Sequence, residues 1–521
     1  MNKRTISSMT CKILGCFHRP QLPRGNCWAK RAIPVVLVIS ILGLSACGVT
    51  AGPRLSESQF NPDFFAYLDN RIPLWMKTLD VPGVSVAVIR EGEMVWSNAY
   101  GYADRENDIP MRVNTICRAE SISKSVTAWG VLRLMEQGLL ELDTPIAEYL
   151  SDQDSLNSSI DEQSITVRML LSNTAGLPLG TIGNDAEYNP QDQLPSVRDY
   201  LLSETDQLFE PGHTFLYSNV GFNWLELLVE EASGHDFADY MQTEILTPLG
   251  MRSASYDWQD DLYRALAPGY DLQSEPVAPY IYPVNASGGL LADVESIAQF
   301  VIAGMQDANQ DRESVLAWES VHLLHTPQTE IPCLFGLVAD YYGFGHFIET
   351  LPDGGRAVWH GGQGHGWMTH FHANPETGDG IVILTNSQRS WPLIAKILSA
   401  WSDWSGVGPV KFSRINYGSL AMQGLIGIVV FAALWEVIRL LQGLIHGKRK
   451  WAPLSRAARK QRLAKMAAGI AGMLALIWSA AQPYLFVSSV FPSTARIAGI
   501  SLFGLCIILV VSALFPRQVK S

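Results

Sequence analysis

Hydrophobic and polar positions divide the chain into a mixed central part and an apolar C-terminal part. Between residues 58 and 405, short β-like runs cluster near the two ends, at Val84–Ile89, Met94–Tyr100, Tyr342–Glu349 and Gly380–Thr385, with helical patterns between them. Strands on both sides of a helical middle are typical of one sheet that the two ends of a segment build together. We therefore predict an α+β domain over 58–405, in which an antiparallel sheet is flanked by helices and carries a helical insert.

The C-terminal part contains three apolar stretches, which lie at about 420–441, 466–490 and 497–515. A helix of about 20 apolar residues crosses the hydrocarbon core of a bilayer, so each stretch is long enough to span it. The first stretch is apolar except near its end, where we expect Glu436 and Arg439 to lie at the membrane interface. The sequence thus predicts a membrane region over 406–521.

The loop between the first two stretches indicates their direction. Residues 442–465 carry basic side chains and no acidic ones, and cytoplasmic loops of membrane proteins are enriched in Lys and Arg. We therefore predict that this loop is cytoplasmic, which places residues 58–405 on the extracytoplasmic side.

The N-terminal segment favours the same sidedness, because it has the features of an export signal. Basic residues precede an apolar run at 33–46, which is short for a membrane span but typical of a signal peptide. Small residues then precede Cys47, and this resembles the lipobox of bacterial lipoproteins. We predict a lipoprotein-type signal peptide over 1–47, lipidation of Cys47 and a linker over 48–57. An ordinary secretory signal and an uncleaved anchor are the alternatives.

Charge and cysteine content narrow the class of protein. The net charge is −12, although the segments 1–47 and 446–521 contain no acidic residue, so the middle of the chain is strongly acidic. Such a domain repels phosphate polymers, which excludes nucleic acid as a partner. Of the seven cysteines, only Cys117 and Cys333 fall in the predicted exported domain. They either form a disulfide or remain two buried thiols.

The first motif with chemical content is Ser121-Ile-Ser-Lys124, the only Ser-x-x-Lys of the chain, where an apolar helical pattern begins. Residues three apart lie on one face of a helix, so the hydroxyl and the amine can touch. A helix N-terminus favours negative charge on the serine, and a desolvated lysine can take its proton. The alternative is an N-cap serine followed by a solvated lysine.

The second motif is Tyr217-Ser-Asn219, on a predicted loop that leads into a helix. A phenol beside an amine can relay a proton between a nucleophile and a leaving group. The amide of Asn219 offers a donor and an acceptor to a substrate amide. Taken alone, a packed tyrosine with an asparagine cap is the simpler interpretation.

The third motif, His360-Gly361-Gly362-Gln363, follows a strand-like run. Glycines at that point let backbone N–H groups approach a ligand closely, as an oxyanion hole requires, and His360 can supply a donor or a positive charge. Three further histidines have a spacing that fits neither a helical pair nor a known zinc site, namely His365, His370 and His372. We therefore predict neither a metal nor a cofactor.

In order and spacing, the three motifs resemble those of the penicillin-recognising serine enzymes, and the chain is most similar to the class C beta-lactamase-related family. Shorter matches accompany them, such as Val81-Pro-Gly-Val-Ser-Val-Ala-Val and Ser287-Gly-Gly-Leu. The resemblance covers roughly residues 58–404. It implies hydrolysis through an acyl-enzyme.

The resemblance also implies a role for each motif residue. Ser121 would be the nucleophile, and Lys124 and Tyr217 would manage its proton. The substrate-binding residues would be Asn219, His360, Gly361 and Gly362. The backbone N–H groups of Ser121 and Gln363 would form the oxyanion hole.

The chain departs from the family pattern in the third motif, which usually begins with lysine, threonine and glycine. Histidine has no permanent charge at neutral pH, so His360 weakens the grip on a substrate carboxylate and disfavours a dedicated beta-lactamase. The expected protein is a membrane-anchored hydrolase of the bacterial cell envelope, acting on peptidoglycan-type or other D-amino-acid peptides or on beta-lactams. The alternatives are an esterase that uses the same site on small acyl esters and a non-catalytic envelope-binding or sensor protein.

Overall fold

The structure is a computed structural model. It describes the following residues: 62–517, except 151–159, 183–185, 205, 259–260, 262–264, 306–314, 333–334, 453–458 and 483–485. The predicted signal peptide over 1–47 with Cys47, the linker over 48–57 and Cys333 lie outside these residues. Cys117 is a buried free thiol on the short strand β4 (Cys117–Arg118).

The main sheet of the described chain has nine strands in the order β3-β2-β1-β12-β11-β10-β9-β8-β7. The strands are β1 (Gly83–Arg90), β2 (Glu93–Asp104), β3 (Ile109–Pro110), β7 (Thr329–Glu330), β8 (Tyr341–Tyr342), β9 (Phe347–Thr350), β10 (Arg356–Gln363), β11 (Met368–Asn374) and β12 (Asp379–Thr385). Strands β1 and β12 pair antiparallel in the middle of the sheet, with Val84 opposite Thr385. This confirms the predicted antiparallel sheet to which distant parts of the chain contribute.

The run predicted as one strand at Tyr342–Glu349 is divided between β8 and β9. The two strands pair antiparallel through a tight turn that contains Gly345, whose φ is +67°. Glycine adopts such a left-handed conformation without steric cost. The turn therefore follows from a glycine that an alternation pattern does not detect.

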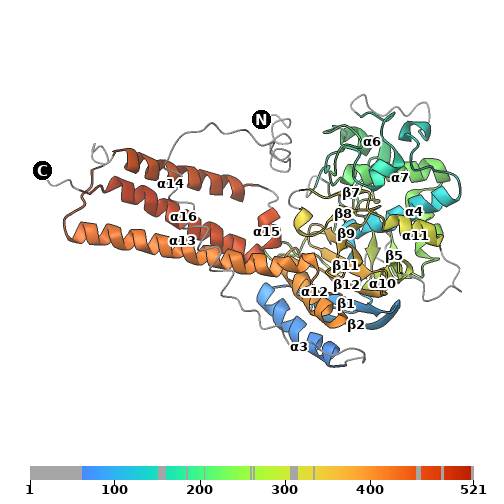
Figure 1. Cartoon of the computed structure of the whole chain (residues 1–521), viewed down its shortest axis with the longest axis horizontal. Helices are drawn as coiled ribbons and strands as arrows, with labels where there is room; N and C mark the ends of the chain where they lie inside the picture. The colour runs from blue at the N-terminus through green and yellow to red at the C-terminus, as the bar shows by residue number, and fades with distance from the viewer. Residues whose placement is uncertain are drawn as a thin grey trace.

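Alternating side chains of the strands build two cores on opposite faces of the sheet. Val84, Val86 and Val88 of β1 belong to one core with α3 (Pro62–Leu79) and α12 (Trp391–Ser405). Ala87 and Ile89 belong to the other core, which the helical insert covers. The insert contains α4 (Ser123–Glu136), α5 (Val167–Leu171), α6 (Val197–Ser203), α7 (Asn219–Ser233), α8 (Phe237–Met241), α10 (Val294–Ala303) and α11 (Trp318–Leu324). Figure 1 shows it packed along one side of the sheet.

Three helices of the described chain are long and apolar enough to cross a membrane, as predicted. They are α13 (Arg414–Ile445), α14 (Arg459–Ala480) and α16 (Pro492–Leu514). Helix α16 packs against both others, and all three extend away from the sheet (Figure 1).

The second of these helices differs from the stretch predicted at 466–490. Helix α14 begins at Arg459 and ends at Ala480, and a separate short helix follows, α15 (Phe486–Val490). Pro483 lies between them in the sequence, and proline ends a helix because it lacks the backbone donor. A hydropathy pattern does not detect the end of α14, since all the residues around it are apolar or uncharged.

Glu436 and Arg439 were both expected at the membrane interface, but only Arg439 is exposed. Glu436 is buried between the helices, where it contacts Lys465 of α14 and accepts a hydrogen bond from Ser512 Oγ of α16 at 2.7 Å. A carboxylate in such surroundings needs these partners, because burying an unpaired charge is costly.

Candidate active site

Ser121 lies at the entrance to a buried helix. It belongs to a single helical turn, η2 (Glu120–Ile122), that continues directly into α4. The preceding residue, Glu120, has a φ of +52°, which is uncommon for a residue with a side chain. Backbone strain of this kind concentrates at functional sites.

Lys124 is fully buried, and its amine contacts three oxygen atoms. Its Nζ lies 3.2 Å from Ser121 Oγ, 2.8 Å from Asn219 Oδ1 and 2.6 Å from the carbonyl oxygen of Ser287. A charged amine has three protons and donates to all three oxygens, whereas a neutral amine has two. When the two protons of the neutral form point to Asn219 and Ser287, the lone pair is left for the Ser121 hydroxyl. The alternative of a solvated lysine is therefore wrong.

The surroundings of Lys124 favour the neutral form of its amine. Burial lowers the pKa of Lys124 from its ordinary 10.5 to about 7, because a charged amine loses its hydration there. The nearby carboxyl of Glu120 acts in the opposite direction and raises this pKa. A large share of the Lys124 side chains is thus able to accept a proton at neutral pH.

Tyr217 also contacts the nucleophile. Its hydroxyl is hydrogen-bonded to Ser121, and its ring stacks on Phe335 and Phe347 with centroid distances of 6.0 Å. Burial raises the pKa of Tyr217, so its hydroxyl stays protonated at neutral pH. Of the two residues expected to handle the serine proton, Lys124 is therefore the one available as a base at neutral pH, and Tyr217 is a donor.

Asn219 is brought to Lys124 by the start of α7. The N-cap of this helix is Ser218, whose Oγ accepts a hydrogen bond from the backbone N–H of Gly221 at 2.9 Å. Asn219 is thus not the cap that the simpler interpretation of this motif assumed. Because its Oδ1 accepts from Lys124, the two amide N–H groups are what it has to offer a substrate carbonyl.

His360 lies on β10 beside these residues. It is fully buried, and its Nε2 lies 3.3 Å from Tyr342 Oη. Burial, reinforced by the charge of Lys124, lowers the pKa of His360 well below its ordinary value. The imidazole is therefore neutral at neutral pH, and it supplies no positive charge for a substrate carboxylate.

Gly362 lies where β10 contacts the turn before Ser121. A Cβ at this position would come within 2.2 Å of Thr369 Oγ1 and 2.3 Å of the Ala119 carbonyl oxygen, so glycine is required. Thr369 Oγ1 donates a hydrogen bond of 2.7 Å to that same carbonyl and holds the turn against the sheet. The neighbouring Gly361 faces the opposite side, toward Trp391. This packing brings the backbone of β10 next to the nucleophile, while the oxyanion hole itself stays a prediction.

Gln363 ends β10, and its side chain is held from two directions. Oε1 accepts a hydrogen bond from Trp391 Nε1 at 3.0 Å, and Nε2 donates to Ser489 Oγ at 2.9 Å. Ser489 belongs to α15, in the connection between two of the apolar helices. This contact could not be predicted from the sequence, because no local pattern relates the two positions.

An acidic side chain that the sequence motifs did not include also lies beside the nucleophile. The buried carboxyl of Glu120 accepts hydrogen bonds from Tyr282 Oη at 3.0 Å and from Tyr280 Oη at 3.3 Å. The guanidinium of Arg118 lies 4.1 Å from the centroid of the Tyr280 ring. Burial raises the pKa of Glu120 to about 7, so its charge changes close to neutral pH. The only available signal was its position immediately before Ser121.

The three histidines that follow the third motif do not form one cluster, because His365 lies apart from the other two. His370 Nε2 lies 3.4 Å from His372 Nδ1 in the core, whereas His365 Nδ1 pairs with Glu187 at 3.0 Å. Among the residues that the structure describes, no group of three or more His, Cys, Asp or Glu side chains is arranged to hold a metal ion.

Comparison with curated proteins gives relatives for the same part of the chain. The chain is 26% identical over 343 residues to penicillin-binding protein 4* of Bacillus subtilis (strain 168). This match covers 61% of the chain and 70% of that protein. It is 24% identical over 311 residues to Protein flp of Staphylococcus aureus (strain N315), covering 59% and 60% of the two chains. The similarity thus spans less than two thirds of Protein flp.

Solved structures show the same fold. The octameric penicillin-binding protein homologue from Pyrococcus abyssi superimposes with a TM-score of 0.56 at 26% identity, over 64% of this chain and 77% of that one. The beta-lactamase/D-alanine carboxypeptidase from Pseudomonas syringae shares the fold with a TM-score of 0.52 at 18% identity, over 62% and 94% of the two chains. The family model described as Beta-lactamase matches residues 68–397, well over half of the sequence. The chain therefore belongs to the beta-lactamase family of serine hydrolases.

Proposed function

We propose that the protein is a serine hydrolase that works through an acyl-enzyme on Ser121. The observation that carries this proposal is the buried amine of Lys124, 3.2 Å from Ser121 Oγ, with acceptors at its two other contacts. Burying an amine costs folding free energy, so its place beside the hydroxyl is better explained by catalysis than by stability.

In the proposed reaction, the Lys124 amine takes the proton of Ser121 as Oγ attacks the carbonyl carbon of the substrate. The backbone N–H groups of Ser121 and Gln363 stabilise the oxyanion that forms. Tyr217 donates its proton to the leaving group and regains one from Lys124, which holds the serine proton. Water then attacks the acyl-enzyme by the reverse route, which releases the acid and restores the Ser121 hydroxyl.

We propose peptidoglycan-type or other D-amino-acid peptides as substrates, with beta-lactams as ligands of the same site. The names of the relatives support this substrate class, as does the crystal structure of SurE with D-Leu, which has a TM-score of 0.56 at 25% identity. The neutral His360 favours cleavage of an internal bond, because a C-terminal residue would bring a carboxylate for which this side chain supplies no positive charge.

An esterase acting on small acyl esters is the second candidate. The same neutral, buried His360 favours it, since such an ester carries no carboxylate to be held. The complete set of contacts around Lys124 disfavours a non-catalytic sensor, because binding alone needs no base beside a hydroxyl.

We also propose that the hydrolase domain lies outside a bacterial cell membrane, anchored by the apolar helices. Helix α13 begins at the domain and ends at Ile445, so the start of the basic segment that follows it lies at the opposite end of the helices (Figure 1). A basic loop at that end favours a cytoplasmic position for it and an extracytoplasmic position for the domain.

The test is covalent labelling of the full chain in detergent with a fluorescent penicillin, followed by intact-mass measurement. We expect one adduct on the wild type and on Ser203→Ala, a control at an exposed serine of α6, and none on Ser121→Ala. Absence of an adduct together with Ser121-dependent hydrolysis of p-nitrophenyl butyrate would assign the esterase function. Absence of both activities would refute the acyl-enzyme proposal.

A further inference from the structure

The connection between the second and third apolar helices returns to the hydrolase domain. Within it, α15 packs against α12, and Figure 1 shows this short helix between the long helices and the domain. Ser489 and Val490 of α15 are only 2% and 6% exposed. A hydroxyl buried at such a contact requires a partner, and the side chain of Gln363 provides it.

The amide of Gln363 bridges the two parts of the protein. Its oxygen is held by Trp391, the first residue of α12, and its nitrogen donates to Ser489 Oγ at 2.9 Å. The backbone of this residue ends β10, three positions after His360 and directly after Gly362. A side chain fixed at both ends leaves the backbone to which it is attached little freedom to move.

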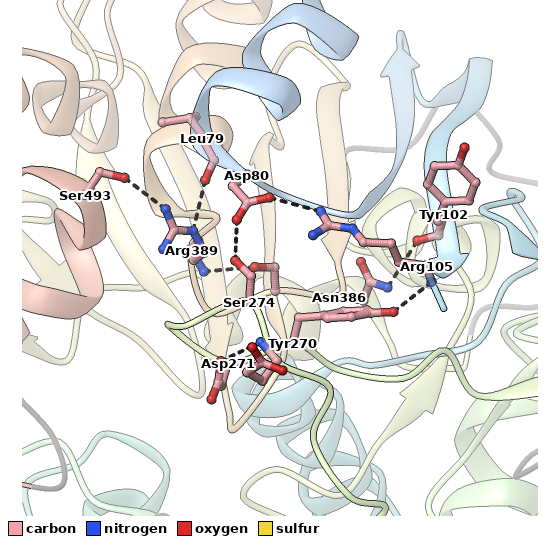
Figure 2. Close-up of polar contacts among 12 residues, drawn as sticks. Leu79, Asp80, Tyr102, Arg105, Tyr270, Asp271, Ser274, Asn386, Arg389 and Ser493 are labelled. Atoms are coloured by element: carbon pink, nitrogen blue, oxygen red, sulfur yellow. Dashed lines mark hydrogen bonds and ion pairs between the residues drawn. The ribbon is translucent and has the colours of Figure 1, made fainter. Parts of the chain in front are cut away.

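A second polar contact joins the same surfaces. Arg389, in the connection from β12 to α12, donates to Ser493 Oγ of α16 at 2.9 Å and to the Leu79 carbonyl at 3.1 Å (Figure 2). It also donates to the Leu272 carbonyl at 2.8 Å. Arg389 therefore links the start of α16 to two further segments of the domain, at Leu79 and at Leu272.

We propose that Ser489 is a positioning residue of the active site, which makes the membrane region a structural part of the catalytic apparatus. By holding the Gln363 amide, Ser489 fixes the end of β10, and with it the backbone N–H that would face the oxyanion. This inference rests on the proposed acyl-enzyme function. It assigns to α15 a role that a membrane anchor alone does not need.

The physical basis is the sensitivity of acyl transfer to the position of the oxyanion donors. Loss of one such donor costs about 10²–10³ in kcat, and displacement of a catalytic group by 1 Å costs about 10². Release of the Ser489 hydrogen bond from the Gln363 amide displaces the donor less than that, so we expect a decrease in kcat of about tenfold. Asn219, which would contact the substrate, is untouched, so KM should change little.

The experiment compares Ser489→Val with Ser489→Thr in the full chain, in detergent or nanodiscs. The two side chains have the same shape and differ in the hydroxyl, so the comparison isolates the hydrogen bond to Gln363. We expect the threonine variant to keep the wild-type kcat and the valine variant to lose about tenfold in kcat with KM unchanged. Equal kcat values for the two variants, or a loss confined to KM, would overturn the proposal.

Two further variants separate positioning from docking. Ser493→Ala removes the contact to Arg389 at the same surface without touching Gln363, and we expect an unchanged kcat. In the background of Gln363→Met, which cannot donate to Ser489, the valine substitution should have no additional effect. A loss of kcat in Ser493→Ala equal to that in Ser489→Val would overturn the specific role of Ser489. Comparison of the wild type with Ser121→Ala tests the proposed acyl-enzyme function separately from the role of Ser489.

Discussion

The reactivity of Ser121 depends on the protonation state of one neighbouring side chain. Because burial lowers the pKa of Lys124 to about 7, its amine is charged below that pH and cannot accept the serine proton. We expect the acylation rate by penicillin to fall about tenfold per unit as pH decreases below the pKa, and to level off above it. Stopped-flow measurement between about pH 5 and pH 9 checks this decrease, which is the acidic limb of the pH–rate profile.

Lys124→Arg is the matched control for this pH dependence. A guanidinium stays charged throughout the same range and cannot act as a base. The variant should therefore show a rate lower by about 10²–10⁴ without the limb near pH 7. A limb that persists in this variant would show that another group produces it.

Glu120 should shift the same limb in a predictable direction. Its carboxylate raises the pKa of Lys124, so Glu120→Gln, which keeps the shape of the side chain and one of the two oxygens that accept from the tyrosines, should move the midpoint to lower pH. Because both groups titrate near pH 7, the midpoint belongs to the pair, and we expect a shift of up to about one unit. The exposed Asp239→Asn serves as the control and should leave the midpoint in place. An unchanged or higher midpoint in Glu120→Gln would contradict this account.

At the scale of elements, the site depends on how closely β10 approaches the turn before Ser121. Gly362→Ala places a methyl group within 2.3 Å of backbone and threonine atoms, so the strand or the turn must move. We expect destabilisation of about 1–3 kcal/mol and an acylation rate lower by about 10². Thermal unfolding and acylation of the same samples measure both effects.

Gly355→Ala, immediately before β10, is the companion variant. A Cβ there meets the carboxylate ends of Asp353 and Glu376, which can move aside, so stability and acylation should stay near wild type. Equal effects of the two substitutions would mean that any side chain added near β10 disturbs the protein, and that Gly362 has no special role.

The elements predicted correctly were those encoded by local patterns. Ser121 and Lys124 share one face of a helical turn whatever surrounds them, and β1 and β2 follow from the β-like runs at Val84–Ile89 and Met94–Tyr100. The burial of Lys124 and the contact of its amine with the Ser287 carbonyl depend on tertiary packing. No spacing along the chain indicates that residues more than 160 positions apart meet.

The whole molecule shows the same division between local and tertiary information. Hydropathy predicted three apolar helices, since each is a continuous stretch, but it placed the residues of α15 inside the second one. It also could not foresee that Glu436 joins all three helices through Lys465 and Ser512. Such contacts arise when helices from different parts of the sequence pack together.

The position of the domain relative to the membrane gives the last prediction. The domain and the start of the basic segment after Ile445 lie at opposite ends of α13 (Figure 1), so they would face opposite sides of a bilayer that the helices cross. The basic loop should face the cytoplasm.

We expect a membrane-impermeant maleimide to label His235→Cys, on the exposed surface of the domain, in intact spheroplasts. Lys450→Cys, in the loop, should be labelled only after lysis. The parent chain gives the background from native cysteines. The reverse pattern, or labelling of both positions before lysis, would contradict this topology and with it the access of the enzyme to substrates outside the cell.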